Sequence, residues 1–333
     1  MHRLLQMGMT VYPEDAVIQA PLAGHTDMPM RASSRRHGCR YAFTEMIDAG
    51  SLVFGNQKTL TLAQRSPLED FLGIQLVGSD LDHLKRAVEI INERDYNVLD
   101  FNLGCPAPKV ERKCEGIAFA LHRPDEAVKA FELIVRTSRI PATVKTRIQH
   151  PEDPEPTVRF AKRLEEAGAQ ALTLHGRVMK AFYSGPVAFH IIRAVREALT
   201  IPVIANGGIM DAASYREMRE KTGCSRVMIA RGALGNPWIF SEVSDPAFQP
   251  PSVQEFADEL ERHLHEMTAF YGEELGFRIG RKCILEYLRG RGYPGTLRAS
   301  ASYIATEADF RRMMDEIRKG PVGAPDPARM IRR

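Results

Sequence analysis

The stretch DFNLGCPAPKV, residues 100–110, places a cysteine where an apolar run gives way to a rigid turn. The run before Cys105 is typical of a buried strand, and the neighbouring glycine and prolines end that strand. A thiol at such a turn is either a small apolar filler or a group that acts as an acid or a nucleophile. The choice depends on the charged groups that the fold brings beside it.

Two pairs of basic residues, each spaced two apart, lie at the ends of later apolar runs. Lys145 and Arg147 end ATVKTRI, and His175 and Arg177 end ALTLHGR. Residues two apart on a strand point to the same face, so each pair could project into one site. Buried cations need a compensating group nearby, such as a phosphate or an electron-rich ring. The alternatives are an exposed strand end for the first pair and a hydrogen-bonded core histidine for the second.

Glycines follow two further apolar runs. IPVIANGGI carries Asn206, Gly207 and Gly208, and RVMIARGALG carries Ala230 and Arg231. Exposed backbone N–H groups beside a guanidinium predict a phosphate-binding cradle. Tight turns without a ligand are the alternative interpretation.

Eight apolar or β-branched runs must position these residues. They span 16–24, 41–47, 71–78, 97–104, 142–148, 171–177, 201–209 and 226–235. Helical patterns lie between most of them, such as the stripe of Leu81, Leu84, Val88 and Ile91. Continuous apolar strands that alternate with helices predict a parallel (β/α)8 barrel, with a doubly wound sheet as the alternative. In a barrel the carboxyl ends of the strands surround the active site.

The composition changes after Phe240. The segment SEVSDPAFQPPSV is typical of a linker, and residues 252–319 carry only helical patterns. We therefore predict a barrel domain over residues 1–243, a small all-helical domain over 250–320 and a disordered tail over 321–333. The helical domain concentrates basic side chains in one stretch, at positions 278, 281, 282, 289, 291 and 298.

The length, net charge and cysteine content of the chain limit the class of protein. The chain has 333 residues, a net charge of +3 and five cysteines without a CxxC pair. This cysteine pattern argues against a disulfide framework and a zinc site, and it favours a reducing cytoplasm. No apolar run is long enough for a membrane span or a signal peptide. We predict no metal and no membrane partner, and we favour a monomer.

Several motifs together resemble those of the tRNA-dihydrouridine synthases, which are FMN-dependent reductases of uridine in tRNA. They are APLAGHTDMPMR, QLVGSD, DFNLGCPAPKV, VKTR, LTLHGR, IPVIANGGI, TGCSRVMIARGALGNPWIF and RKCILEYLRG, in this order along nearly the whole chain. The resemblance implies the same (β/α)8 barrel followed by a helical domain.

The resemblance also implies a role for each site residue. FMN would be bound by Pro21, Leu22, Ala23, Gln75, Lys145 and His175, and its phosphate by Asn206, Gly207, Gly208, Ala230 and Arg231. The uridine would be bound by Asn102, Arg147 and Arg177. The tRNA backbone would be held by Arg278, Arg281, Lys282 and Arg289, as phosphate contacts require.

The reaction that the resemblance implies is a reduction. NADPH, or NADH, would reduce FMN, hydride would pass from flavin N5 to uracil C6, and Cys105 would protonate C5. The target base would have to leave its stack in the RNA. The alternatives are an FMN barrel enzyme acting on a free pyrimidine, similar to dihydroorotate dehydrogenase, dihydrouridine formation in another RNA, and an RNA-binding protein with an inactive barrel.

One position and two stretches differ from the sequence that is usual in the family. Gly208 stands where many members have Asp, which argues against a side-chain role there. The stretch KVERKCEGIAFAL is bulkier than the usual Gly- and Ala-rich one and places Cys114 near the Cys105 turn. The segment YSGPVAFH lacks the acidic and Trp residues that are customary in the family at this place.

Overall fold

Eight parallel strands close into a barrel in the computed structural model, which describes residues 11–326. The strands are β1 (Val17–Gln19), β2 (Tyr41–Asp48), β3 (Leu72–Val77), β4 (Val98–Leu103), β5 (Ala142–Arg147), β6 (Leu172–His175), β7 (Val203–Asn206) and β8 (Arg226–Ile229). Each strand pairs with the next along the chain, and β8 closes on β1. The prediction of a (β/α)8 barrel is confirmed.

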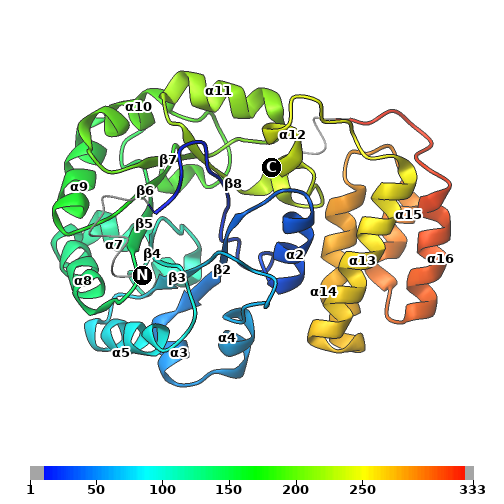
Figure 1. Ribbon diagram of the computed structural model, residues 1–333, viewed down its shortest axis with the longest axis horizontal. Helices are drawn as coiled ribbons and strands as arrows, with labels where there is room; N and C mark the ends of the chain where they lie inside the picture. The colour runs from blue at the N-terminus through cyan, green and yellow to red at the C-terminus, as the bar shows by residue number, and fades with distance from the viewer. Residues whose placement is uncertain (1–10, 327–333) are drawn as a thin grey trace. The chain divides into compact units, whose positions relative to one another are not determined.

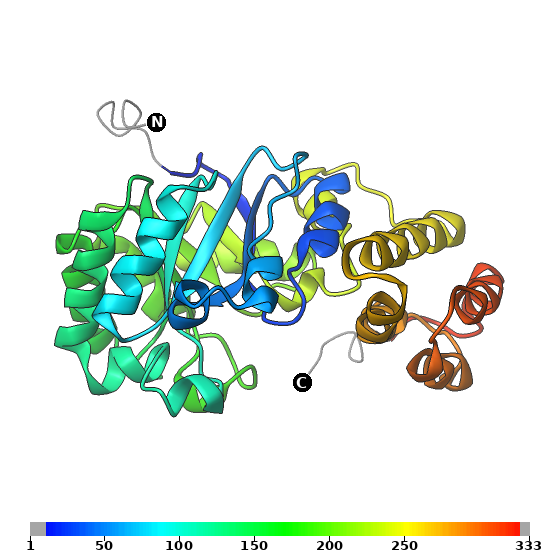
Figure 2. The same cartoon turned by 90° about the horizontal axis from the view of Figure 1, so that it is seen from below.

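Helices cover the outside of this barrel (Figures 1 and 2). They are α3 (Ala49–Val53), α4 (Gln57–Leu62), α5 (Leu81–Asn92), α6 (Pro108–Glu111), α7 (Ile117–His122), α8 (Pro124–Thr137), α9 (Glu155–Glu166), α10 (Phe189–Ala198) and α11 (Ala212–Thr222), with the 3-10 turn η1 (Met179–Ala181). Helix α5 shows the predicted stripe, because Leu84, Val88 and Ile91 are fully buried. Leu81 of the same stripe lies in the first turn and is exposed.

The barrel interior changes from apolar to polar along the strands. Its apolar layer includes Ile18, Phe43, Val98, Ile204 and Met228. Gly73 leaves space for this layer, because a Cβ there would meet the Phe43 ring at 2.3 Å. Asp100 and Asn206 follow two residues after Val98 and Ile204, so they share the inner face nearer the carboxyl ends. The polar residues are thus held above a tightly packed base.

The described chain divides into two compact units. The barrel unit runs to Gly24 and continues over Arg40–Ile209 and Ala213–Ala230. The second unit joins His25–Cys39, Met210–Ala212 and the chain from Arg231 onward. Its elements are α2 (Met28–Arg36), η2 (Arg231–Ala233), α12 (Ile239–Ser244), α13 (Val253–Tyr271), α14 (Glu273–Leu288), α15 (Gly295–Ser300), η3 (Ala301–Tyr303) and α16 (Glu307–Arg318).

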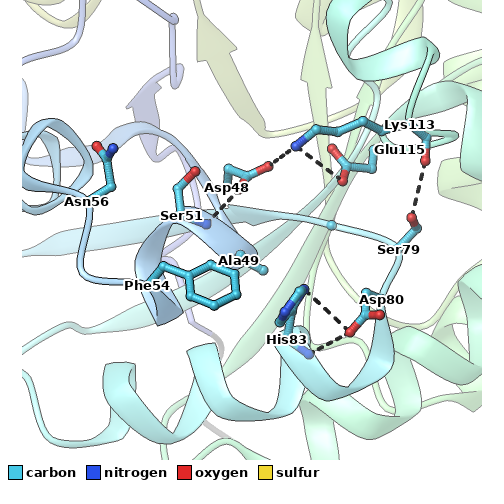
Figure 3. A pocket seen from close by; sticks show the side chains of 12 residues that line it. Asp48, Ala49, Ser51, Phe54, Asn56, Ser79, Asp80, His83, Lys113 and Glu115 are labelled. Atoms are coloured by element: carbon cyan, nitrogen blue, oxygen red, sulfur yellow. Dashed lines mark hydrogen bonds and ion pairs between the residues drawn. The ribbon is translucent and has the colours of Figure 1, made fainter.

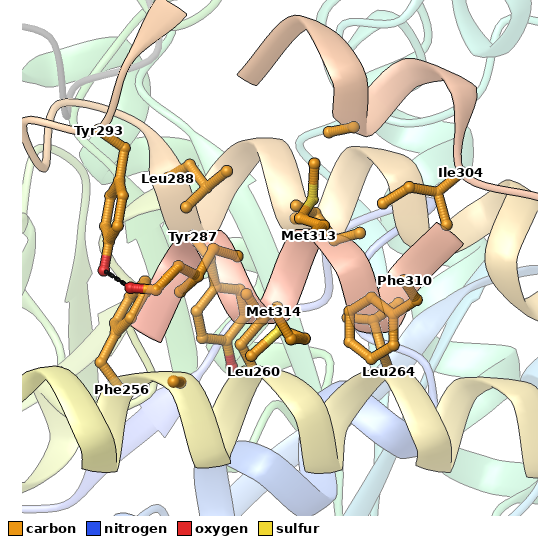
Figure 4. Packing of buried hydrophobic residues seen from close by; sticks show 14 of the residues in the cluster. Phe256, Leu260, Leu264, Tyr287, Leu288, Tyr293, Ile304, Phe310, Met313 and Met314 are labelled. Carbon is orange, nitrogen blue, oxygen red and sulfur yellow. Dashed lines mark hydrogen bonds between the residues drawn. The ribbon is translucent and has the colours of Figure 1, made fainter. Parts of the chain in front are cut away.

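The second unit has an apolar core of its own, drawn in Figure 4. Leu260 and Leu264 of α13, Tyr287 of α14, and Phe310 and Met314 of α16 are buried in it. Capping boxes at Ser252 and Thr306 begin α13 and α16, which satisfies backbone N–H groups at each helix start. The C-terminal helices expected from the sequence are therefore present.

Helix α2 belongs to this second unit although it is distant in sequence. Its Ser33 Oγ donates to Glu259 Oε1 at 2.7 Å, and Arg36 donates to both Glu259 and Glu266. Burial alone would raise the pKa of Glu259, but hydrogen bonds from His37, Arg36 and Ser33 lower it to about 2. Because this network joins residues over 200 positions apart, the sequence pattern does not predict it.

The predicted domain boundaries and the predicted disordered tail remain predictions. Residues 327–333 of that tail lie outside the described residues. Val322 N and Asp326 N donate to the carbonyl oxygens of Gly292 and Gly290, at 3.1 and 2.7 Å. Across residues 11–326, the structure has no helix with the length and apolar character needed to cross a membrane.

Candidate active site

The strand register brings most of the predicted site residues together at one end of the barrel. The paired positions are Gln75 with Asp100, Asn102 with Lys145, Arg147 with His175, and His175 with Asn206. Because side chains alternate along each strand, these positions share the inner face with the layer that contains Val98 and Ile204. The carboxyl ends of β3 to β7 therefore carry one polar cluster.

A chain of hydrogen bonds runs through this cluster to the cysteine turn. Thr143 Oγ1 and Gln75 Nε2 each donate to the Asp100 carboxylate at 2.7 Å. Asn102 Nδ2 donates to Gln75 Oε1 at 2.7 Å. Asn102 Oδ1 in turn accepts from the backbone N–H of Cys105 at 2.9 Å. The orientation of each amide is thus set by its neighbour, starting from Asp100.

Asp100 is a site residue that the sequence reasoning missed. Its side chain is 1% exposed, and burial raises its pKa to about 6 although Gln75 and Thr143 donate to it. The available signal was its place in DFNLGCP, two positions before Asn102 on the same strand face. An acid within an otherwise apolar strand must find donors in the interior.

We expect Thr143→Val to weaken the fold in a pH-dependent manner. The substitution keeps the shape of the side chain but removes a donor from Asp100, and hydrogen bonds to charged groups contribute about 1.5–3 kcal/mol. Asp100 becomes a carboxylate in the folded chain only above its pKa of about 6, so the loss of unfolding free energy should grow as pH rises through that value. Urea unfolding of the cofactor-free protein on both sides of this pKa measures it.

Thr146→Val is the matched control. Thr146 is equally buried on β5, and its Oγ1 donates to the backbone oxygen of Leu103 at 2.9 Å. That acceptor does not titrate, so the destabilisation should be the same at both pH values. A pH-independent loss in Thr143→Val as well would contradict the assignment of Thr143 to Asp100.

Cys105 is half-buried on a turn that several groups hold in place. Arg147 Nε donates to Gly104 O at 2.8 Å, and Ile117 N donates to Cys105 O at 3.2 Å. Gly116, at φ 59°, packs so closely that a Cβ there would meet Cys105 O at 2.6 Å. Burial raises the pKa of the Cys105 thiol, while the cations Arg147 and Lys145 partly oppose that rise. The thiol is therefore protonated at neutral pH, which suits an acid better than a nucleophile.

Lys145 is the second titratable group with a strongly altered environment. Its Nζ donates to Asn206 Oδ1 at 3.1 Å, and Asn206 Nδ2 donates to Met228 O at 2.8 Å. Burial and the nearby Arg147 lower the pKa of Lys145 to about 8, although Asp100 counteracts them. The site thus places two cations near one buried carboxyl group and favours a ligand that carries or acquires negative charge.

His175 and the glycines after β7 lie against one another. A Cβ on Gly207, at φ 124°, would meet His175 Cδ2 at 2.8 Å, so this position requires glycine. His175 Nε2 is 3.4 Å from a guanidinium nitrogen of Arg177, and Arg177 Nε donates to Gly185 O at 2.9 Å. Gly208 also has a positive φ, of 74°.

The remaining predicted residues lie at other loop and helix positions. Pro21, Leu22 and Ala23 follow β1 in the barrel unit, and the backbone N–H of the next residue, Gly24, donates to Glu45 Oε2 at 2.5 Å. Ala230 ends the barrel unit, whereas Arg231 begins η2 in the second unit. Their predicted roles in binding FMN stay predictions.

The four predicted RNA contacts lie at one helix, α14, and its end. Arg278 is exposed, and Lys282, four residues further along, is half-buried. Arg281 Nε donates to Ile304 O at 2.8 Å, and Arg289 Nε donates to Glu286 Oε2 at 2.9 Å. Part of the donor capacity of Arg281 and Arg289 therefore serves the fold.

Comparison with known proteins gives one consistent result. The family model described as dihydrouridine synthase matches residues 18–319. The tRNA-dihydrouridine synthase B of Pasteurella multocida (strain Pm70) is 34% identical over 282 residues, which cover 83% of this chain and 85% of that protein. The protein of the same name from Pseudomonas aeruginosa PAO1 is 35% identical over 309 residues, or 90% of this chain and 89% of that protein.

One further relative is about as similar as these two, whereas the similarity to a solved structure is much lower. A probable tRNA-dihydrouridine synthase of Rhodobacter capsulatus is 34% identical over 84% of this chain and 87% of that protein. The solved structure of a nitroalkane oxidase from Streptomyces ansochromogenes is 16% identical at a TM-score of 0.40, over 68% of this chain and 67% of that one. This similarity is too low to support an inference about function. The family match spans the barrel and the C-terminal helices, and it agrees with the motifs that the sequence displays. The chain therefore belongs to the dihydrouridine synthase family.

Proposed function

We propose that this protein is a tRNA-dihydrouridine synthase, which uses FMN and NADPH to reduce the C5–C6 double bond of uridine in tRNA. The observation that carries the proposal is the anchored turn of Cys105, held through Asn102, Gln75 and Asp100 beside the cation of Lys145. The names of its relatives, which cover most of the chain, support the same substrate class.

The residues at the barrel mouth fit FMN. The excess positive charge of Lys145 and Arg147 suits a ring system that becomes anionic on reduction. Gln75 offers amide groups of fixed orientation, and Gly207 offers its backbone at a position where a side chain would collide with His175. Lys145, Gln75 and His175 would hold the ring, and Asn206, Gly207 and Gly208 its phosphate. The chemistry that FMN supplies when bound is hydride transfer, from the reductant to C6 of the uracil.

Cys105 would complete the reduction by giving its proton to C5. The raised pKa keeps the thiol protonated until it is needed, and the nearby cations stabilise the thiolate that remains. Asn102, one step along the hydrogen-bond chain, would orient the turn and contact the base. Arg147 would hold the same turn from the other side through Gly104 O, at 2.8 Å, while its second bond, to Phe182 O at 2.7 Å, ties it to the loop after η1.

The deciding experiment supplies the purified protein with FMN, NADPH and unmodified tRNA transcripts. Dihydrouridine detected in the tRNA by nucleoside mass spectrometry is the expected result. Parallel reactions with free uridine and orotate test the alternative of a free-pyrimidine reductase. Turnover of those small molecules without dihydrouridine in tRNA would overturn the proposal. Replacement of NADPH by NADH identifies the preferred reductant.

We expect the double variant Arg278→Ala, Lys282→Ala to bind tRNA more weakly and with a smaller salt dependence. Each lost phosphate contact lowers the slope of log affinity against log salt by about 0.7–0.9. The two lie four residues apart on α14 and can face the same phosphate backbone. Filter binding at a series of salt concentrations measures both quantities.

The matched control removes two exposed cations from α8 on the outside of the barrel, as Lys129→Ala, Arg136→Ala. It changes the net charge by the same amount and should leave the slope near that of the parent. If the two double variants lose the same amount of affinity, the α14 residues act only through overall charge.

A further inference from the structure

A cavity of about 420 Å³ lies beside the carboxyl ends of β2 and β3, outside the hydrogen-bond chain that reaches Cys105. Its size falls within the range of small-molecule pockets, about 300–1,000 Å³. Its lining includes Asp48, Phe54, Asp80, His83, Lys113 and Glu115 (Figure 3). Lys113 and Glu115 belong to the stretch KVERKCEGIAFAL, which departs from the Gly- and Ala-rich sequence usual in the family.

One side of this Glu115 cavity is aromatic. Phe54, directly after α3, is 74% exposed and meets the His83 ring edge-on, with centroids 5.4 Å apart. Proteins that bind single-stranded RNA stack unpaired bases on such rings, and one stack contributes a large part of the affinity for a base. The exposed face of Phe54 is therefore available to a planar ligand.

The opposite side is polar, and Asp48 and Lys113 on it are paired whereas Glu115 receives no hydrogen bond from the described residues. Lys113 Nζ lies 2.7 Å from Asp48 Oδ2 but 4.0 Å from Glu115 Oε1, beyond hydrogen-bond range. The Glu115 side chain is only 10% exposed, and within residues 11–326 its carboxylate accepts no hydrogen bond. Burial, with Asp48 adding to it, raises the pKa of Glu115 to about 7. A poorly solvated carboxylate of this kind favours a ligand that donates hydrogen bonds to it.

We propose that the Glu115 cavity binds a guanine base of the RNA substrate, with the ring on Phe54 and the Watson–Crick edge on Asp48, Lys113 and Glu115. This inference rests on the proposed function. Guanine presents two adjacent donors, N1–H and N2–H₂, beside the acceptor O6, and the cavity offers carboxylates beside an ammonium group. Adenine and cytosine place a ring acceptor where guanine has N1–H, and uracil flanks its donor with two acceptors.

The charges of the cavity favour a base over a phosphate. Asp48, Glu115 and Asp80 line it against the single cation Lys113, which is already paired with Asp48. An anionic group would be repelled, so the backbone of the bound nucleotide must lie outside.

The cavity is also linked to the cysteine turn. Glu115 precedes Gly116 and Ile117, which pack against and bond to the backbone of Cys105. A guanine held at Glu115 would therefore fix a nucleotide that neighbours the target in the folded RNA. Contacts to flanking nucleotides are a general source of selectivity in enzymes that act on an extruded base.

The test titrates the FMN-loaded protein with guanosine, inosine and adenosine, followed by saturation-transfer NMR. Inosine lacks only the N2 amino group, so it should bind about tenfold more weakly than guanosine, as should adenosine. Phe54→Ala and Glu115→Gln should each weaken guanosine binding by about tenfold or more. Phe54 is exposed, so its removal does not threaten the fold.

Two controls match these variants. Leu68→Ala removes an apolar side chain that is 81% exposed elsewhere on the barrel unit, and Glu111→Gln neutralises an exposed acid near the same turn. Both should bind guanosine as the parent does. Equal affinities for the three nucleosides, or guanosine binding unchanged in both Phe54→Ala and Glu115→Gln, would overturn the assignment.

The assay for dihydrouridine in tRNA separates this inference from the proposed function. Dihydrouridine formation without discrimination among the nucleosides would refute the guanine site and leave the reaction standing. Guanosine discrimination in a protein that forms no dihydrouridine would retain the base site and refute the reaction.

Discussion

Cys105→Ala should bind FMN and accept electrons from NADPH as the parent does, yet form dihydrouridine about 10²–10⁴ times more slowly, the usual loss when a general acid is removed. The variant keeps the turn, because the contacts of residue 105 with Asn102 and Ile117 use backbone atoms. The two half-reactions are measured separately. Bleaching of the flavin absorbance reports reduction by NADPH, and single-turnover mass spectrometry reports dihydrouridine.

Cys114→Ala is the control for this variant. Cys114 is a half-buried thiol on the adjoining turn, and its Sγ lies 3.9 Å from Ala118 O. It should form dihydrouridine at the parental rate. Because burial raises the pKa of Cys105, the parent should also keep its thiol protonated, and so its proton donor, through neutral pH. Parental dihydrouridine formation by Cys105→Ala would refute the acid role.

Lys145→Met should reduce dihydrouridine formation by about 10²–10³, the loss typical when one preorganised donor to a developing anion is removed. Lys145 is the cation that Asn206 holds at the barrel mouth, through a hydrogen bond of 3.1 Å. Flavin affinity should fall as well, and equilibrium dialysis of FMN measures that loss. An unchanged rate and an unchanged FMN affinity together would place the reacting centre elsewhere.

The cofactor-free protein offers an independent readout of the same residue. The pKa of Lys145 is lowered to about 8 from an ordinary 10.5, by burial and by Arg147. Below pH 8 the ammonium is charged in both folded and unfolded chains, so its desolvation cost is fully present. Between these two values the folded chain releases a proton that the unfolded chain retains, and the parent gains stability with rising pH.

A variant without an ionisable group at position 145 lacks this gain in stability with rising pH. The unfolding free energy of Lys145→Met relative to the parent should therefore decrease as pH rises from about 8 towards 10.5. Lys129→Met, at an exposed position on α8, should show no such trend. A constant difference between Lys145→Met and the parent over this range would mean that Lys145 is solvated in the folded protein.

Much of the fold can be predicted from the sequence because a parallel barrel requires a strong local pattern of apolar runs and amphipathic helices. Strands buried on both faces are largely apolar, and each of the eight predicted runs coincides with one strand of the barrel, with β2 ending one residue beyond its run. The ends of those runs then locate the site, since parallel strands place all their carboxyl ends together. Gln75, Lys145 and His175 were found by this argument together with the family motifs.

Other features depend on contacts between distant residues, and no local pattern carries them. Asp100 gains its role from Thr143, 43 positions later, and the Glu115 cavity depends on Asp48 meeting Lys113, 65 positions later. Helix α2 joins the second unit only because Glu259 accepts from Ser33 and Arg36. The sequence by itself determined the family, the barrel and the position of the thiol. The tertiary structure decided which buried carboxyl groups find donors, because strand register and loop packing set those distances.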